Sequence, residues 1–156
     1  MNLYFAYGSN MHRDVMATHA PTAIPVGVGA LANHHFVITV DGYASVEPKH
    51  SRTVYGVLWR IGSRDRVRLD AWENIAGGLY RAKILPVQYA GRRHSVLTYI
   101  ARQQPAGRAK AGYMELVIAA ALEWQLPQAY IQYLRCFLPK LSGGATWRSL
   151  KEYGWT

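Results

Sequence analysis

Met1-Asn2-Leu3-Tyr4-Phe5-Ala6-Tyr7-Gly8-Ser9-Asn10-Met11 joins an apolar, aromatic run to a turn that contains glycine. The run predicts a buried strand, and the segment from Met11 to Ala20 predicts a short helix. Ser9 and Asn10 are residue types that commonly cap helix N-termini. A turn at a helix start has backbone N–H groups without internal partners, so it can bind an anion or a developing oxyanion. The alternative is a capped helix start that binds nothing.

The composition predicts one compact domain. The chain has 156 residues, of which 50% are hydrophobic, so a single domain over residues 1–156 can bury a sizeable core. We expect that core in about 3–137 and an irregular tail in 142–156. Five Trp and eleven Tyr supply more aromatic surface than a core needs, which favours an aromatic pocket. The single cysteine, Cys136, excludes an internal disulfide, and its apolar helical setting predicts a buried thiol.

The net charge of +9 comes from 18 Lys and Arg against 9 Asp and Glu. The densest basic group straddles a predicted strand end and helix start, at Arg60, Arg64, Arg66 and Arg68. No nucleic-acid motif accompanies it, so we expect a solvated basic face and no nucleic-acid partner, with attraction of an anionic small substrate as the alternative. Neither a signal peptide nor an apolar run of membrane-spanning length is visible, so we expect a cytoplasmic protein with no membrane partner.

Strand patterns alternate irregularly with helices along the chain. Together with the first strand, residues 24–31, 35–40, 53–60, 79–89 and 94–101 give about six strands, and residues 43–46 read as a short extended piece. Further helices are expected over 64–74, 112–124 and 128–137. Pro48–Arg52 reads as a polar loop, Ala90-Gly91 as a hairpin turn, and Gly56 as a close approach of another backbone or a ligand. This order favours an α+β fold whose strands curl into a small barrel.

Glu73 is the best candidate for a general acid or base among the nine acidic residues. It ends a predicted helix, shares a face with Leu69, and is followed by the flexible Gly77-Gly78. Beside Trp72 and Tyr80 its carboxylate would lose water, and burial raises a carboxyl pKa towards neutrality, where a proton shuttle works best. The alternative is a surface glutamate paired with an arginine.

The sequence lacks the residue patterns of a metal site and of a serine hydrolase. His34 and His35 project from opposite faces of a strand, and His12 and His19 are two helical turns apart, so no metal site is expected. Ser9 has no nucleophile-elbow context, which leaves a serine hydrolase unsupported.

Several motifs occur together and in order: Tyr4-Phe5-Ala6-Tyr7-Gly8-Ser9-Asn10-Met11, Tyr55-Gly56-Val57-Leu58-Trp59, Leu69-Asp70-x-x-Glu73, Gly78-Leu79-Tyr80, Tyr99, Tyr113, Ala120-Ala121, Gln125-Leu126-Pro127 and Tyr130. In these motifs the chain resembles the gamma-glutamylcyclotransferase family, which has the AIG2-like fold. The resemblance extends from Leu3 to about Phe137. It implies a small mixed β-barrel flanked by helices.

The resemblance also implies an activity. Family members act without a cofactor and cleave a γ-glutamyl amide by attack of the substrate's own α-amine, releasing 5-oxoproline and a free amine or amino acid. This reaction is classed with lyases and acyltransferases. Glu73 matches the catalytic acid/base of the family. The residues that match its substrate-binding positions are Tyr7, Gly8, Ser9, Asn10, Tyr80, Tyr99 and Tyr113.

Within this resemblance, the tyrosine hydroxyls are expected to hold the α-carboxylate of the substrate or to orient Glu73. Asn74 departs from the family pattern, because many relatives carry Gly after the glutamate. The region from Val40 to Arg52 is shorter than in some relatives, which leaves the leaving amine open.

Two other functions stay open. One is a specialised member that removes a γ-glutamyl group from a larger amine or natural product. The other is a non-catalytic domain of the same fold that binds a ligand or partner. In either enzymatic case the expected partner is a small γ-glutamyl substrate, and the chain would be a monomer or a homodimer.

Overall fold

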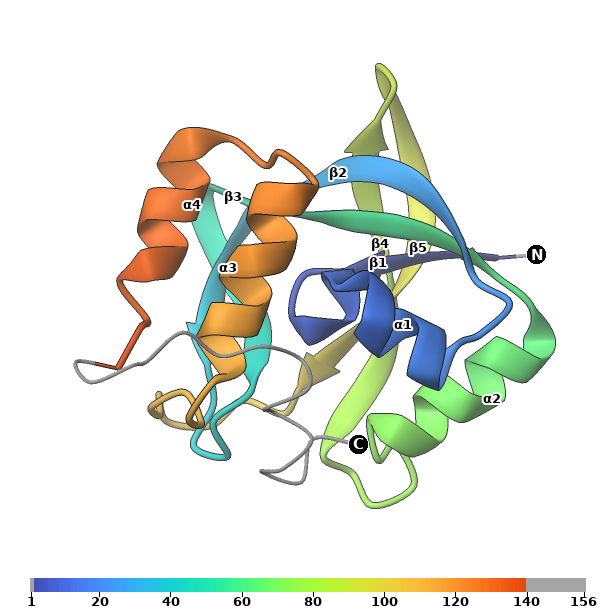
Figure 1. The fold of residues 1–156 in the computed structure, drawn as a ribbon, viewed down its shortest axis with the longest axis horizontal. Helices are drawn as coiled ribbons and strands as arrows, with labels where there is room; N and C mark the ends of the chain where they lie inside the picture. The colour runs from blue at the N-terminus through green and yellow to red at the C-terminus, as the bar shows by residue number, and fades with distance from the viewer. Residues whose placement is uncertain (1, 140–156) are drawn as a thin grey trace.

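The computed structural model describes residues 2–139, and Figure 1 shows their arrangement. The tail expected over 142–156 lies outside the described residues. Within residues 2–139, no helix combines the length and the apolar character needed to cross a bilayer.

A closed barrel forms the centre of the fold, with its strands hydrogen-bonded in the order β1-β3-β2-β4-β5. In the described part of the chain these are β1 (Asn2–Ala6), β2 (Ile24–Ile38), β3 (Ala44–Ile61), β4 (Tyr80–Tyr89) and β5 (Arg92–Ala101). Neighbours are antiparallel except β1 and β5, which close the barrel in parallel where Tyr4 meets Leu97. Closure leaves the barrel without free sheet edges, and it confirms the predicted mixed β-barrel.

The helices lie on the outside of the barrel (Figure 1). They are the short 3₁₀ turn η1 (Ser9–Met11), α1 (Arg13–His19), α2 (Ser63–Trp72), α3 (Tyr113–Glu123) and α4 (Gln128–Arg135). The interior face of α3 is almost wholly apolar, and Met114, Val117, Ala120 and Ala121 are fully buried. The structure thus has a helix in the expected region 112–124, and its apolar face packs against the core.

Two long strands account for the difference between the five strands observed and the six expected. The segments 24–31 and 35–40 belong to one strand, β2, which bends at Asn33, where φ is +58°. Opposite this point the pairing steps from Ala32 with Thr53 to His34 with Pro48. Residues 49–52 therefore bulge out of the ladder although they lie within β3, so the expected polar loop is an irregular part of a strand.

Gly56 in β3 lies where another backbone approaches closely, as the sequence predicted. A Cβ at this position would collide with the carbonyl oxygen of Ala6 in β1 and lie 2.7 Å from the Phe5 ring. The neighbour is a strand of the barrel itself, so the glycine serves barrel closure and not a ligand.

We expect Gly56→Ala to destabilise the protein by about 1–3 kcal/mol, because overpacking at a buried strand pair forces the backbones apart. Chemical denaturation monitored by tryptophan fluorescence measures this loss. Gly62→Ala is the control, because the nearest atom to its Cβ lies 4.0 Å away. Equal losses in the two variants would show that the contact with β1 carries no special cost.

Asp65 fixes the position of α2 on the barrel. Its buried carboxylate accepts hydrogen bonds from the Thr22 hydroxyl (2.6 Å), the Thr22 amide (3.2 Å) and the Gly62 amide (3.2 Å). Because a buried carboxylate is costly unless its oxygens are hydrogen-bonded, this cluster ties the chain between α1 and β2 to the start of α2. The last turn of α2 is thereby held beside η1.

Cys136 is exposed, and the expectation of a buried thiol was wrong. The buried face of α4 carries Tyr130, Ile131 and Leu134. Cys136 follows Leu134 by two residues, a rotation of about 200° on a helix, so it points away from the barrel.

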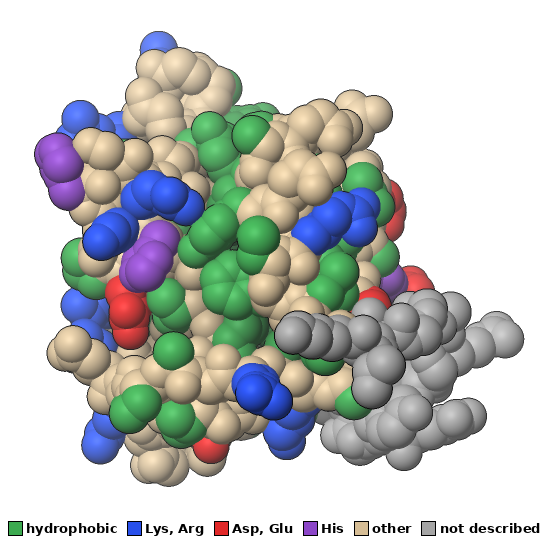
Figure 2. Space-filling view, turned by 90° about the vertical axis from the view of Figure 1, so that its left-hand side faces the viewer, with side chains coloured by type: hydrophobic (Ala, Val, Ile, Leu, Met, Phe, Trp, Pro, Cys, Tyr) green, Lys and Arg blue, Asp and Glu red, His purple; other side chains and the backbone are tan. Residues whose placement is uncertain are grey.

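On the face of the molecule that Figure 2 shows, basic side chains do not gather into one block. Figure 2 shows Lys and Arg dispersed among hydrophobic and polar atoms on the face at the left of Figure 1. Some arginines cover aromatic rings: Arg13 lies 4.0 Å from the centroid of Trp124, and Arg52 lies 5.0 Å from that of Tyr133.

Candidate active site

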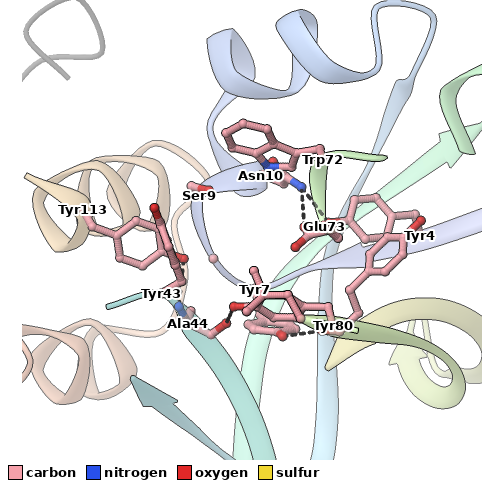
Figure 3. Close-up of a pocket in the computed structure, with 13 residues that line it drawn as sticks. Tyr4, Tyr7, Ser9, Asn10, Tyr43, Ala44, Trp72, Glu73, Tyr80 and Tyr113 are labelled. Carbon is pink, nitrogen blue, oxygen red and sulfur yellow. Dashed lines mark hydrogen bonds between the residues drawn. The ribbon is translucent and has the colours of Figure 1, made fainter. Parts of the chain in front are cut away.

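A pocket of about 230 Å³ opens beside the junction of β1 and η1 (Figure 3). Six tyrosines, a tryptophan and a single carboxylate dominate its walls. The residues that line it are Tyr4, Tyr7, Gly8, Ser9, Asn10, Tyr43, Ala44, Trp72, Glu73, Leu79, Tyr80, Tyr99 and Tyr113. Every residue that the sequence analysis named as catalytic or substrate-binding therefore lies in this one pocket.

Glu73 is the C-cap of α2, and its side chain points into the pocket (Figure 3). Its Oε1 lies 3.4 Å from the Nδ2 of Asn10, which donates to it. No Lys, Arg or His in residues 2–139 forms an ion pair with this carboxylate. Burial therefore acts without a compensating cation and raises the pKa of Glu73 from 4.5 to about 8. A carboxyl with this pKa can both accept and release a proton near neutral pH.

Asn74 occupies the position where the family resemblance leads us to expect Gly. Its φ is +52°, in the left-handed region that Gly adopts freely and that Asn tolerates better than most residues. Its Oδ1 also accepts from the Gly77 amide at 3.2 Å. The substitution thus preserves the turn that leads from Glu73 towards β4.

The turn after β1 differs from the capped helix start that the sequence suggested. Neither Ser9 nor Asn10 caps α1, which begins at Arg13 with the His12 side chain accepting from the Asp14 amide at 3.2 Å. The Asn10 side chain is turned into the pocket instead, where its Nδ2 also donates to the Tyr4 hydroxyl at 2.9 Å. The amide that would have capped the helix is used to hold the pocket together.

Gly8 permits a close contact across the pocket. A Cβ on Gly8 would lie 2.6 Å from the hydroxyl oxygen of Tyr113 and 3.3 Å from the Cβ of Ala44. Tyr113 is buried, and its hydroxyl accepts from the Ala44 amide at 3.2 Å. Hydrogen bonds from Ser9 to the same hydroxyl oppose the rise in the Tyr113 pKa that burial causes. The turn at Gly8 and Ser9 therefore packs against, and hydrogen-bonds to, the hydroxyl of Tyr113.

Three other pocket tyrosines use their hydroxyl protons in fixed hydrogen bonds. Tyr7 donates to the backbone carbonyl of Tyr99, and Tyr80 donates to that of Ala44 at 2.7 Å. Tyr99 donates to the Oδ1 of Asp70 at 2.6 Å. Burial raises the pKa of all three tyrosines, so each stays a neutral phenol.

Trp72 forms the wall next to Glu73, and its place is set by α1. Its ring stacks on His19 with centroids 3.8 Å apart and an interplanar angle of 20°. Burial lowers the pKa of His19 to about 4, so the stacked imidazole is neutral at physiological pH. The apolar stack shields one side of the Glu73 carboxyl from water.

Sequence reasoning missed Tyr43 and Ala44 as pocket residues. They lie directly after the Asp41-Gly42 turn, where β3 begins. They reach the pocket only because the hairpin of β2 and β3 folds back to it. No local pattern marks such a position. Within residues 2–139, no three His, Cys, Asp or Glu side chains are grouped as a metal ion would require.

A sequence model of the AIG2-like family matches residues 53–134, more than half of the chain. The chain is similar to the mouse (Mus musculus) protein named gamma-glutamylcyclotransferase, with 25% identity over 150 residues that span 88% of this chain and 79% of the relative. The human (Homo sapiens) protein of the same name is 23% identical, over the same 88% of this chain and 79% of the relative.

Solved structures share the fold. A gamma-glutamyl cyclotransferase superposes with a TM-score of 0.86 at 21% identity and 98% coverage of both chains. YkqA from Bacillus subtilis superposes with a TM-score of 0.76 at 25% identity, over 92% of this chain and 56% of that one. The family match, the curated relatives and the shared barrel lead to one conclusion: the chain belongs to the AIG2-like family.

Proposed function

We propose that this chain is a cofactor-independent cyclotransferase that converts a γ-glutamyl amide into 5-oxoproline and a free amine or amino acid. The observation that carries the proposal is the Glu73 carboxyl, which lies in an aromatic pocket with a pKa raised to about 8. Relatives named gamma-glutamylcyclotransferase support the general activity. The single exposed thiol, Cys136, is consistent with a reducing compartment, and we place the activity in the cytoplasm.

The reaction needs two protons to move from the α-nitrogen of the substrate to the nitrogen of the leaving amine. Ionised Glu73 takes a proton from the α-ammonium of the substrate, and the free amine attacks the γ-carbonyl carbon to form a C–N bond. The carbonyl oxygen then carries the negative charge of the tetrahedral intermediate. When this intermediate collapses, the original amide C–N bond breaks, and protonated Glu73 gives its proton to the leaving nitrogen. The ionised carboxylate then takes the second surplus proton from the new ring nitrogen, which leaves a neutral lactam, and passes it to the released amine. One carboxyl thus serves as base and as acid.

The turn formed by Gly8, Ser9 and Asn10 would stabilise the oxyanion. It lies in the same pocket as Glu73, with the Asn10 side chain in hydrogen-bond contact with the carboxylate. Loss of one donor to an oxyanion typically costs about 2.7–4 kcal/mol of transition-state stabilisation. Binding the glutamyl chain in a folded shape makes the attack intramolecular, and good orientation is worth roughly 7–11 kcal/mol.

A panel of γ-glutamyl amides tests the proposal, with 5-oxoproline measured by mass spectrometry. The panel contains γ-glutamyl-L-alanine, ε-(γ-glutamyl)-L-lysine and a bulky γ-glutamyl anilide. We expect release of 5-oxoproline with an equal amount of amine from at least one donor. Preference for the bulky donor would identify a specialised member of the family. If no donor yields product while the protein binds polyanions in a salt-sensitive way, the chain is a binding domain of this fold.

The activity should depend on pH through Glu73. Its carboxyl must be ionised to accept the proton, so kcat/KM should rise with pH and level off above a pKa of about 8. Two pH units below this point, activity should be about a hundredfold lower, because only about 1% of the carboxyl is ionised there. Initial rates between about pH 5 and pH 9 measure this profile. A plateau that begins near pH 5 would contradict the role of a buried Glu73.

A further inference from the structure

Tyr99 lines the pocket, and its hydroxyl proton is already used in a hydrogen bond. That proton is donated to the Oδ1 of Asp70 at 2.6 Å. The same oxygen accepts a hydrogen bond from the Nε of Arg66 at 2.8 Å, in an ion pair one helical turn apart on α2. A carboxylate held by arginine is a strong acceptor, so the direction of the Tyr99 hydrogen bond is fixed. Tyr99 therefore has no proton to donate to the pocket. Its oxygen also accepts from the Arg66 side chain, so only its remaining acceptor capacity is open to a ligand.

Two neighbouring tyrosines are in the same state. Tyr7 donates to the carbonyl of Tyr99, and Tyr80 donates to the carbonyl of Ala44. A phenol has one proton and can accept through its oxygen. The wall formed by Tyr7, Tyr80 and Tyr99, here called the tyrosine wall, thus presents hydrogen-bond acceptors and aromatic surface to a ligand. Neither feature suits a carboxylate.

We infer that the tyrosine wall binds the α-ammonium group of the γ-glutamyl substrate, and that Asp70 is the positioning residue that keeps Tyr99 an acceptor. This inference rests on the proposed function. It revises the expectation that tyrosine hydroxyls hold the α-carboxylate. That carboxylate then lies elsewhere in the pocket, and the tyrosine wall distinguishes an amine-bearing glutamyl chain from one without the amine.

The electrostatics of the pocket agree with a bound cation. Burial is the main cause of the raised pKa values of the tyrosine wall, and the charge of ionised Glu73 adds to the rise at all three hydroxyls. The positive charge of Arg66 acts in the opposite sense on Tyr99. Tyr4 meets the Tyr99 ring edge-on at a centroid distance of 5.6 Å and also lines the pocket, so the aromatic surface extends beyond the tyrosine wall. An ammonium group has three N–H bonds. One can reach Glu73 for proton transfer while the others are held by tyrosine oxygens.

Two truncated ligands separate the charges of the glutamyl group. Glutaryl-L-alanine keeps the carboxylate and lacks the ammonium, whereas 4-aminobutyryl-L-alanine keeps the ammonium and lacks the carboxylate. Isothermal titration calorimetry gives their affinities without any turnover, and mass spectrometry verifies that each ligand stays intact. We expect Tyr99→Phe to weaken the aminobutyryl ligand about tenfold and to leave the glutaryl ligand unchanged, because only the former loses a charged hydrogen bond.

Tyr133→Phe is the matched control. Its hydroxyl donates to the Phe36 carbonyl at 2.8 Å, and Tyr133 is not among the residues that line the pocket. This variant should leave both affinities unchanged. A general loss of order caused by removing a tyrosine hydroxyl would instead weaken both ligands in both variants.

Asp70 variants test the positioning role. Asp70→Ala frees the Tyr99 proton to turn into the pocket, so the preference for the aminobutyryl over the glutaryl ligand should fall about tenfold. Asp70→Asn keeps an acceptor oxygen for Tyr99 and should restore most of the preference. A purely structural role for Asp70 would weaken both ligands in parallel and leave their ratio unchanged.

The inference is overturned if Tyr99→Phe weakens the glutaryl ligand and spares the aminobutyryl ligand, or if the ratio of affinities does not respond to Asp70→Ala. Either result leaves the proposed function intact when wild-type protein releases 5-oxoproline. If wild-type protein binds neither ligand and releases no 5-oxoproline, the proposed function itself fails and this inference fails with it.

Discussion

Glu73→Gln should slow the release of 5-oxoproline about a thousandfold while the protein keeps its fold. The amide has nearly the same shape as the carboxyl but cannot take a proton from the α-ammonium or return one to the leaving amine. Removal of a general acid–base group typically slows a reaction by about 10²–10⁴-fold, and we expect a loss within that range. The loss is not at its lower end, because one group serves both steps. Steady-state turnover of the best γ-glutamyl donor measures the loss.

The same variant should be more stable than wild type at alkaline pH. The folded protein holds the Glu73 proton up to a pKa of about 8, whereas the unfolded chain releases it near 4.5. Between these values the folded state binds more protons, so wild-type stability falls as pH rises through this window. Gln carries no such penalty, so its melting temperature should exceed that of wild type near pH 9, with the difference vanishing near about pH 4.

Glu123→Gln is the control for both measurements. Glu123 ends α3 and pairs with Arg13 at 2.8 Å, with a side chain that is 48% exposed. Its replacement should change neither the rate nor the pH dependence of stability, because exposed ion pairs contribute little. Near wild-type release of 5-oxoproline by the Glu73 variant would show that another group moves the proton.

Gly8→Ala should lower kcat/KM at least about a hundredfold, because its Cβ displaces the Tyr113 hydroxyl, and a shift of about 1 Å in a catalytic site can cost that much. Overpacking of the buried contact should also cost about 1–3 kcal/mol of stability. Rates normalised to the folded fraction, together with denaturant unfolding, separate the two effects. Unchanged kcat/KM together with lowered stability would show that the glycine serves folding alone.

The double variant Gly8→Ala with Tyr113→Phe refines this test. Removing the hydroxyl relieves the 2.6 Å contact, so the stability loss should be smaller than the sum of the two single losses. Activity should stay low, because the hydroxyl that accepts from the Ala44 amide is gone as well. Recovery of full activity would mean that only bulk, and not the Tyr113 hydroxyl, matters in this turn.

Local patterns were sufficient to predict the parts of the fold that local physics decides. The hairpin of β4 and β5 turns at Ala90-Gly91, where both φ angles are positive, as a two-residue hairpin turn requires. The sequence was enough to place Glu73 next to Trp72 at the end of a helix, and the raised pKa of Glu73 follows from its burial in the pocket. These features depend on neighbours within a few residues.

Features decided by distant contacts were not predictable. Asn10 is a residue type that commonly caps helices. Its side-chain amide instead donates to Tyr4 and to Glu73, and Glu73 lies far along the chain. Tyr43 and Ala44 enter the pocket only because a long hairpin returns to it. The exposure of Cys136 depends on which face of α4 meets the barrel, and an apolar sequence alone does not determine this.

The position of β1 links assembly of the barrel to assembly of the pocket. This strand pairs with both β3 and β5, carries Tyr4, and leads directly into the turn at Gly8. A folding intermediate that lacks it therefore exposes two unpaired edges, which invite strand exchange between molecules. Refolding yield should consequently fall as protein concentration rises, whereas the specific activity of the recovered monodisperse fraction should stay constant.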